Sequence, residues 1–244
     1  MVTCQVRPQA SVPIPWRPRP SNSDGISVPP THQSDPDFRV LHTLRCIGVA
    51  SEDRVATAAG TARQETIARL RNLSVQGLVE LASGPFGGWG LTDDGRTAQQ
   101  ALVRLELDLT DARDQVHNCY QSFKKLNPDL LQVCSDWQMR RVGQYPILND
   151  HIDSDYDANV LSRLMRVDDA AQPVCDELAN RLSRFGVYGA RLSGALERAL
   201  TGQTDYVADS LESYHAVWFQ LHEDLLVTLG ISRDDERRDS GGAG

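Results

Sequence analysis

Apolar residues recur at helical spacing from Phe38 onward, and glycines divide this pattern into short elements. The first predicted helix is marked by five apolar positions, Phe38, Val40, Leu41, Leu44 and Ile47. A second predicted helix, over residues 55–59, stops at Gly60. A third begins at Thr61 and ends at Gly77, and its inner face consists of Ile67, Leu70 and Leu73. The pattern predicts three short helices packed around one small core.

A hairpin is predicted to follow the third helix. Residues 77–81 indicate a strand, the glycine-rich residues 83–90 a turn, and residues 91–96 the returning chain. At the start of the third helix, Thr61 is the expected N-cap, and Gln64 three residues later completes a capping box.

The most regular pattern comes next. Eight small or apolar residues alternate at spacings of four and three, namely Ala98, Leu102, Leu105, Leu109, Ala112, Val116, Cys119 and Phe123. This predicts one helix over residues 93–125, about 50 Å long at ~1.5 Å per residue, ended by Asn127-Pro128. Its narrow apolar stripe either forms a dimer interface through Leu102, Leu105, Leu109 and Val116 or packs against later helices of the same chain.

The remaining pattern is helical as well. Further helices are expected over residues 128–141, 158–165, 173–200 and 206–229. The predicted fold is therefore mainly α, with three helices and a hairpin joined by a long helix to an all-α bundle. The predicted boundaries are a disordered Pro-rich segment at 1–36, a domain at 37–96, a linker helix at 97–127, a helical bundle at 128–233 and a disordered tail at 234–244.

Charge and composition narrow the function classes. The net charge is −8, yet residues 38–104 carry a net charge of +2 and residues 105–244 a net charge of −10. A modest, salt-sensitive attraction to phosphate is thus possible only through the first domain. No apolar run approaches the ~20 residues of a membrane span, and prolines interrupt the N-terminus where a secretory signal would be apolar. Five widely spaced cysteines without a C-x-x-C motif fit a reducing cytoplasm.

The order of elements over residues 38–96 is that of a winged helix-turn-helix, in which one helix enters the DNA major groove. Three segments, residues 66–73, 77–79 and 91–96, resemble the winged-helix domain of the multiple-antibiotic-resistance regulator (MarR) type. The resemblance covers about 60 of the 244 residues. It implies a homodimeric transcription factor that binds a pseudo-palindromic operator and often responds to a small ligand.

The third predicted helix supplies the expected DNA contacts. Arg63 and Gln64 lie near its start and are the candidates for base reading, while Arg54 and Arg71 are candidates for phosphate contacts. The complete predicted set is Arg54, Thr61, Arg63, Gln64, Arg69 and Arg71. The predicted wing, Phe86, Gly87, Gly88 and Trp89, departs from the family because its tip lacks a cation. Phe86 and Trp89 either contact sugar or fold back onto the core.

The predicted helical bundle offers weaker chemistry. Its aromatic residues favour either an ordinary core or a pocket for a small apolar effector, with Trp137, Tyr214 and Trp218 as the candidate lining. Glu212-x-x-His215 and Asp114-x-x-His117 resemble di-iron spacing, but no second Glu-x-x-His is present. The acidic run at Asp153, Asp155 and Asp157 lacks the Gly and Glu of an EF-hand. Neither a catalytic residue nor a metal or cofactor is predicted.

The sequence thus predicts a cytoplasmic, homodimeric DNA-binding regulator that is not an enzyme. An effector would tilt the long helix and alter the spacing of the two recognition helices. The alternatives are a winged-helix adaptor that binds a protein instead of DNA and, more remotely, a metal-dependent helical-bundle enzyme.

Overall fold

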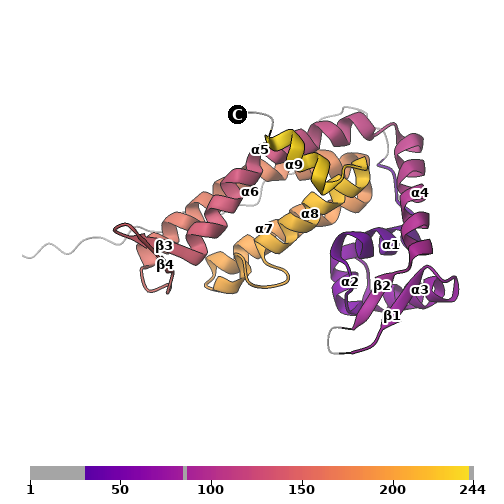
Figure 1. Cartoon of the computed structure of the whole chain (residues 1–244), viewed down its shortest axis with the longest axis horizontal. Helices are drawn as coiled ribbons and strands as arrows, with labels where there is room; N and C mark the ends of the chain where they lie inside the picture. Colours follow the sequence, from indigo (N-terminus) through magenta and orange to yellow (C-terminus); the bar gives the residue numbers. More distant parts are fainter. Residues whose placement is uncertain (1–30, 85–86, 242–244) are drawn as a thin grey trace, which may run out of the picture. The chain divides into compact units, whose positions relative to one another are not determined.

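A computed structural model describes residues 31–84 and 87–241, which are mainly helical and contain two small antiparallel sheets. The described residues from Thr31 onward form one compact unit (Figure 1). No helix within them has both the length and the apolar content needed to cross a lipid bilayer.

Five elements form what we call the N-terminal module, residues 36–91. They are α1 (Pro36–Ile47), α2 (Glu52–Ala59), α3 (Arg63–Val75), β1 (Val79–Ala82) and β2 (Gly88–Leu91). Three helices followed by an antiparallel hairpin is the order that the hydrophobic pattern predicts.

Local chemistry fixes the ends of these helices. The Asp35 carboxylate accepts from the backbone N–H groups of Asp37 and Phe38 and so caps α1. Gly60, at φ +63°, ends α2 in the left-handed conformation that glycine adopts without strain. The predicted cap of α3 is wrong, because Ala62 occupies the N-cap position and no side chain caps the helix there. The hydroxyl of Thr61 instead lies 2.7 Å from that of Thr66.

The hairpin is shorter than predicted. Val79 pairs with Leu91 and Ala82 with Gly88, so the second strand begins inside the predicted glycine-rich turn. The backbone of Ala50 also pairs with that of Trp89, which holds the loop after α1 against β2. Residues 93–96 do not extend the strand, since they form the first turn of the next helix.

The single long helix predicted over residues 93–125 is wrong. The chain forms two helices, α4 (Asp93–Thr110) and α5 (Arg113–Gln138), separated by Asp111 in the left-handed conformation at φ +48°. The predicted end at Asn127-Pro128 is also wrong, because Pro128 lies inside α5. The apolar spacing thus continues across the break at Asp111. Pro128, where the helix was expected to end, does not interrupt α5.

The remaining elements lie C-terminal to α5. They are β3 (Met139–Val142), β4 (Tyr145–Leu148), α6 (Ser154–Arg181), η1 (Ser183–Phe185), α7 (Gly186–Leu200), η2 (Thr204–Tyr206), α8 (Tyr214–Leu229) and α9 (Arg233–Gly241). The β3–β4 hairpin was not predicted, since residues 139–141 were assigned to a helix.

Several predicted boundaries in this part are wrong. Pro173 lies within α6 and does not begin a helix, and α8 begins at Tyr214 because the Ser213 hydroxyl caps it by accepting from the N–H of Ala216. Residues 234–241 are helical and do not form a disordered tail. Of the predicted disordered segment, residues 1–30 lie outside the described residues, whereas His32 pairs with Leu182 in an isolated β-bridge.

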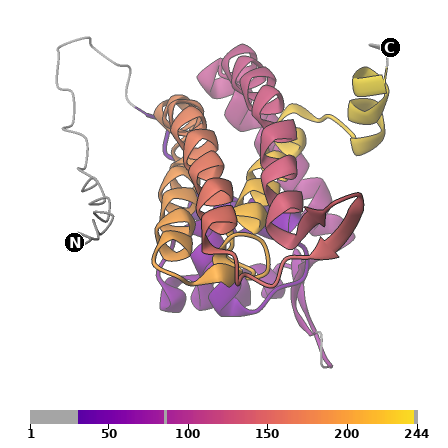
Figure 2. The same ribbon diagram turned by 90° about the vertical axis from the view of Figure 1, so that its left-hand side faces the viewer.

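Four helices, α5, α6, α7 and α8, pack side by side, as Figures 1 and 2 show. Their core also includes Phe38 of α1 and Val103 and Leu107 of α4. A second core lies within the N-terminal module, and Leu102 packs against both. Helix α4 therefore packs against both the N-terminal module and the later helices.

The approach of α4 to the hairpin leaves no room for a side chain at Gly95. A Cβ there would lie 1.9 Å from the carbonyl oxygen of Leu78. We expect Gly95→Ala to lower the free energy of unfolding by about 1–3 kcal/mol, because backbone must move. Gly194→Ala is the control: its Cβ meets nothing within 4 Å in α7, so it should stabilise by about 0.4–1 kcal/mol. Urea unfolding of both variants measures this, and equal stability would contradict the close approach.

Candidate functional site

The outer face of α3 is the candidate nucleic-acid interface. Thr66, Leu70 and Leu73 bury the inner face of this helix, while Gln64 and Arg71 project into solvent. Among the described residues, neither Gln64 nor Arg71 has a hydrogen-bond or ion-pair partner in the chain. These two side chains are therefore available to a ligand.

The other predicted contacts are engaged within the chain. Arg63 binds the carboxylate of Asp53, and its Nη2 lies 3.4 Å from Glu52 Oε2. Arg69 donates from Nη1 to Asp37 Oδ1 at 2.8 Å and from Nη2 to Glu65 Oε1 at 2.9 Å.

The bond to Asp37 raises the pKa of Arg69 above its ordinary value. Thr61 turns inward to Thr66, and Arg54 is half-buried. The acidic partners of Arg63 and Arg69 reduce the positive potential of the α3 surface.

The predicted wing divides between core and solvent. Gly87 is exposed, Gly88 and Trp89 are buried, and Phe86 lies outside the described residues. Trp89 packs in the core of the N-terminal module. Its ring therefore folds back onto the core, which was one of the two expectations, and is not available to contact a sugar.

The predicted dimerisation residues also divide. Val116 is fully buried in the core of the later helices and is not available to a partner, and Leu102 is half-buried. In contrast, Leu105 and Leu109 lie four residues apart on α4 with exposed fractions of 53% and 69%. The exposed apolar positions of the predicted stripe thus belong to α4.

The predicted ligand-lining aromatics do not converge on one cavity. Trp137 packs its ring 4.6 Å from that of His151, and the Tyr214 hydroxyl donates to Asp168 Oδ1 at 3.1 Å. Trp218 stacks on Phe123 at a centroid distance of 4.3 Å. All three predicted residues are buried, and only Trp218 reaches a cavity wall.

A buried charged network that the sequence did not predict joins the N-terminal module to the later helices. Arg184, in η1, donates from Nε to Glu106 Oε2 of α4 at 2.8 Å and from Nη1 to Asp224 Oδ1 of α8. His42 of α1 contacts the same Asp224 oxygen at 2.8 Å through Nε2. Gln99 of α4 donates to His42 Nδ1 at 2.8 Å, which fits a neutral imidazole with its proton on Nε2.

Further polar groups complete this network. Tyr188 donates to Asp224 Oδ2 at 2.9 Å, Arg184 Nη2 donates to the Thr228 hydroxyl at 2.7 Å, and Ser34 donates to Glu106. Thus every charged group has opposite charge or hydrogen-bond partners, as a buried ion network requires.

The pKa shifts follow from burial and from Arg184. Burial lowers the pKa of His42, although the neighbouring Asp224 opposes this. For Asp224, burial alone would raise the pKa, but the charge of Arg184 and the hydrogen bond from His42 reverse the effect and hold the pKa well below its usual range. Burial likewise raises the pKa of the Cys46 thiol well above its ordinary value.

A metal does not fit this site, although His42, Cys46 and Asp224 place potential ligand atoms within 4.8 Å of one another. The guanidinium of Arg184 lies 3.0 Å from His42 Nε2 and already binds Asp224. Burial also raises the pKa of the Cys46 thiol and so disfavours the thiolate, which is the form that binds a metal. The predicted di-iron-like residues take other partners, since Glu212 binds Arg191 through both oxygens.

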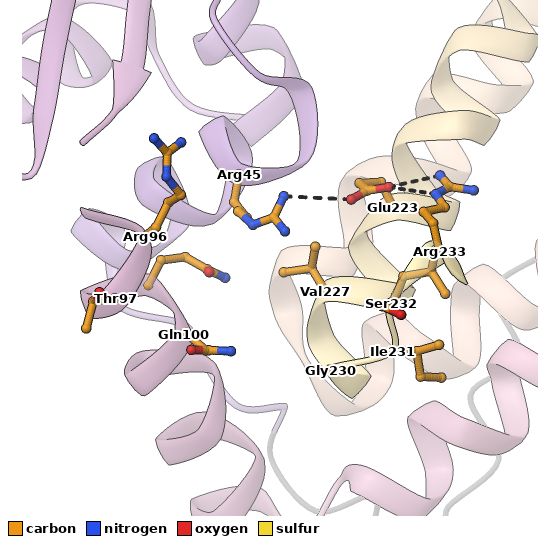
Figure 3. A pocket seen from close by; sticks show the side chains of 12 residues that line it. Arg45, Arg96, Thr97, Gln100, Glu223, Val227, Gly230, Ile231, Ser232 and Arg233 are labelled. Atoms are coloured by element: carbon orange, nitrogen blue, oxygen red, sulfur yellow. Dashed lines mark hydrogen bonds and ion pairs between the residues drawn. The ribbon is translucent and has the colours of Figure 1, made fainter. Parts of the chain in front are cut away.

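A cavity of about 460 Å³ lies beside the network, between α1 and α4 on one side and α8 and α9 on the other. Figure 3 shows Arg45 reaching toward Glu223, which also binds Arg233. Arg96 lines the same cavity, so three arginines accompany one carboxylate there. The wall also includes Gln99, which connects this cavity to His42.

Comparison of the chain with protein-family models, curated proteins and solved structures gave no match.

The buried histidines make stability depend on pH. Burial lowers the pKa of His42 and of His222, so the unfolded chain takes up these protons first as the pH falls below about 6.5. The free energy of unfolding should therefore fall between pH 7.5 and 5.5, by at most about 1.4 kcal/mol per pH unit for each histidine.

Urea unfolding at several pH values measures this slope. His42→Gln should flatten it and lower stability at pH 7.5, whereas His117→Gln, which changes an exposed histidine of α5, should leave it unchanged. A wild-type stability that does not vary with pH would contradict the prediction.

Proposed function

We propose that the chain is a homodimeric, DNA-binding transcriptional regulator of the MarR-like winged-helix type. The observation that carries the proposal is α3, which follows two short helices, precedes a hairpin and turns an exposed polar face outward. Helices presented in this way enter the major groove. On this face, the side-chain amide of Gln64 has a donor and an acceptor that can form two hydrogen bonds with adenine, and Arg71 is suited to contact a phosphate.

We further propose that two copies of the chain associate through α4. A single N-terminal module carries few free cations, and a second copy doubles the phosphate contacts. Leu105 and Leu109 give α4 an exposed apolar edge beside the module, so two copies joined there would present two α3 helices to one duplex. A pseudo-palindromic operator read in the cytoplasm is the partner that fits.

The regulatory mechanism differs from the tilt of one long helix. Because α4 ends at Thr110, it cannot transmit a rigid tilt into α5. Instead, Arg184 of η1 binds Glu106 of α4 and Asp224 of α8, and so links these three elements. A change in the later helices is therefore expected to move α4 and the N-terminal module together.

Selection of random duplex DNA at about 50 and about 200 mM salt tests DNA binding. We expect enrichment of a two-fold motif. Gln64→Ala should relax the preference at one base pair by about 1–3 kcal/mol. Arg71→Ala should weaken all sequences alike and reduce the salt slope by about one.

Arg166→Ala is the matched control, because it removes an exposed arginine from α6. It should change neither motif nor slope. Weak binding that disappears at the higher salt, without an enriched motif, would overturn the proposal.

The dimer is tested by Leu105→Asp combined with Leu109→Asp. Charges on the proposed interface should convert the dimer to a monomer in sedimentation equilibrium while leaving the helical circular dichroism unchanged. Leu211→Asp is the control, since Leu211 is 61% exposed but lies outside α4. A wild-type monomer, or a double variant that remains dimeric, would refute the α4 interface.

The second candidate is a protein-interaction adaptor, and the ion pairs of Arg63 and Arg69 favour it because they leave the α3 surface less positive. Comparison of the wild type with Arg63→Ala combined with Arg69→Ala distinguishes the two. Absence of DNA binding in both proteins, together with a protein that co-purifies with the wild type, would favour the adaptor.

A further inference from the structure

A cavity of about 790 Å³ lies between α5, α8 and α9. This is within the range of cavities that hold a small organic ligand. It is separate from α3, and of the three predicted aromatics Trp218 contributes to its wall.

The cavity has apolar walls that are open to solvent. Phe219 of α8 and Leu131 of α5 are 52% and 51% exposed, and Pro128 lies one turn before Leu131. Trp218 forms a buried part of the wall and is fixed by its indole N–H, which donates to Asn127 Oδ1 at 3.0 Å. The guanidinium of Arg233 lies 4.9 Å from the centroid of the Phe219 ring, so a ligand would contact the remaining exposed surface of Phe219 and the side chain of Leu131.

The charged groups around these walls are mostly positive. Lys124, Arg233 and Arg237 line the cavity with a single carboxylate, Glu236. Glu236 already accepts hydrogen bonds from Tyr120 and His222, at 2.8 and 2.6 Å.

Lys124 differs from the arginines. Its ammonium lies 5.5 Å from the centroid of the Tyr120 ring and pairs with no carboxylate within the described residues. An ammonium beside an apolar wall without an anionic partner is suited to an anion supplied from outside.

We propose that this cavity binds an amphipathic organic anion, with its carboxylate or sulfonate at Lys124 and its apolar body against Phe219, Leu131 and Trp218. A metal cation is disfavoured because three cations line the cavity, and a fully apolar ligand would leave the Lys124 side of the wall unmatched. The anion would connect α5 to α9, since Lys124 comes from the first helix and Arg233 and Arg237 from the second.

This inference names the class of ligand for the regulator proposed above, and it rests on that function only for the effect of binding on DNA. Binding itself is measured without DNA. A failure of the cavity proposal and a failure of the DNA-binding proposal are therefore distinguishable.

The experiment uses the full chain and two fluorescent probes of similar shape. The first is 8-anilino-1-naphthalenesulfonate, which is anionic, and the second is N-phenyl-1-naphthylamine, which lacks the sulfonate. We expect Lys124→Gln to raise the Kd of the anionic probe by about fivefold, as for a partly exposed ion pair, and to leave that of the neutral probe unchanged. Phe219→Ala should weaken both probes.

Lys125→Gln is the matched control, because this neighbouring lysine is exposed and does not line the cavity. It should change neither Kd. Decanoate and benzoate are then added as competitors: displacement by decanoate indicates an aliphatic acid and displacement by benzoate an aromatic one, and either supports the proposal.

Equal effects of Lys124→Gln and Lys125→Gln would overturn the assignment of the anion to Lys124. Affinity for the anionic probe that survives both Lys124→Gln and Phe219→Ala would place the probe elsewhere and overturn the site. Circular dichroism and urea unfolding of each variant establish that it is folded, and Leu131→Ser provides a second test of the apolar wall if Phe219→Ala fails to fold.

Discussion

Arg184 is the charge on which the arrangement of the helices depends. Its guanidinium is buried, and it is compensated by Glu106 from α4 and Asp224 from α8, with His42 from α1 at the same carboxylate. A buried ion is costly unless all its partners are present, and loss of one partner leaves an uncompensated charge. A packing that separated these helices would leave charges unpaired in an apolar core, so the network disfavours such alternatives. Its position explains why the N-terminal module and the later helices form one unit.

Much of the N-terminal module was predictable because its signals are local. Gly60 and Gly77 end elements where positive φ is needed, and apolar spacing identifies the buried faces of α1 and α3. The hairpin was predicted at the right place in the chain, but the start of its second strand at Gly88 was not. A glycine-rich segment indicates a turn more strongly than a strand. There, Gly88 is required by the close approach of the Ala50 backbone, a tertiary contact without a local signature.

The sequence was a poorer guide beyond residue 96 for physical reasons. Apolar residues keep one spacing from Ala98 to Phe123, but Leu105 faces solvent whereas Val116 is buried, because the chain turns at Asp111. Partners in the buried network are far apart in the sequence, and His42 and Asp224 are separated by 182 residues, so no spacing rule relates them. A weaker signal was present: Glu106 lies between two leucines, and Asp224 directly precedes two leucines. Whether α3 contacts DNA remains a prediction that the fold does not test.

The two internal prolines have a consequence for how the helices open. Pro128 and Pro173 have no amide hydrogen, so the carbonyls of Lys124 and Asp169 lack the donor that an uninterrupted α-helix supplies. Each of these helices therefore lacks one hydrogen bond of its backbone ladder, although each is continuous in its path. The two helices pack against each other. We expect the amide hydrogens beside each proline to exchange with solvent faster than those in the uninterrupted turns of the same helices.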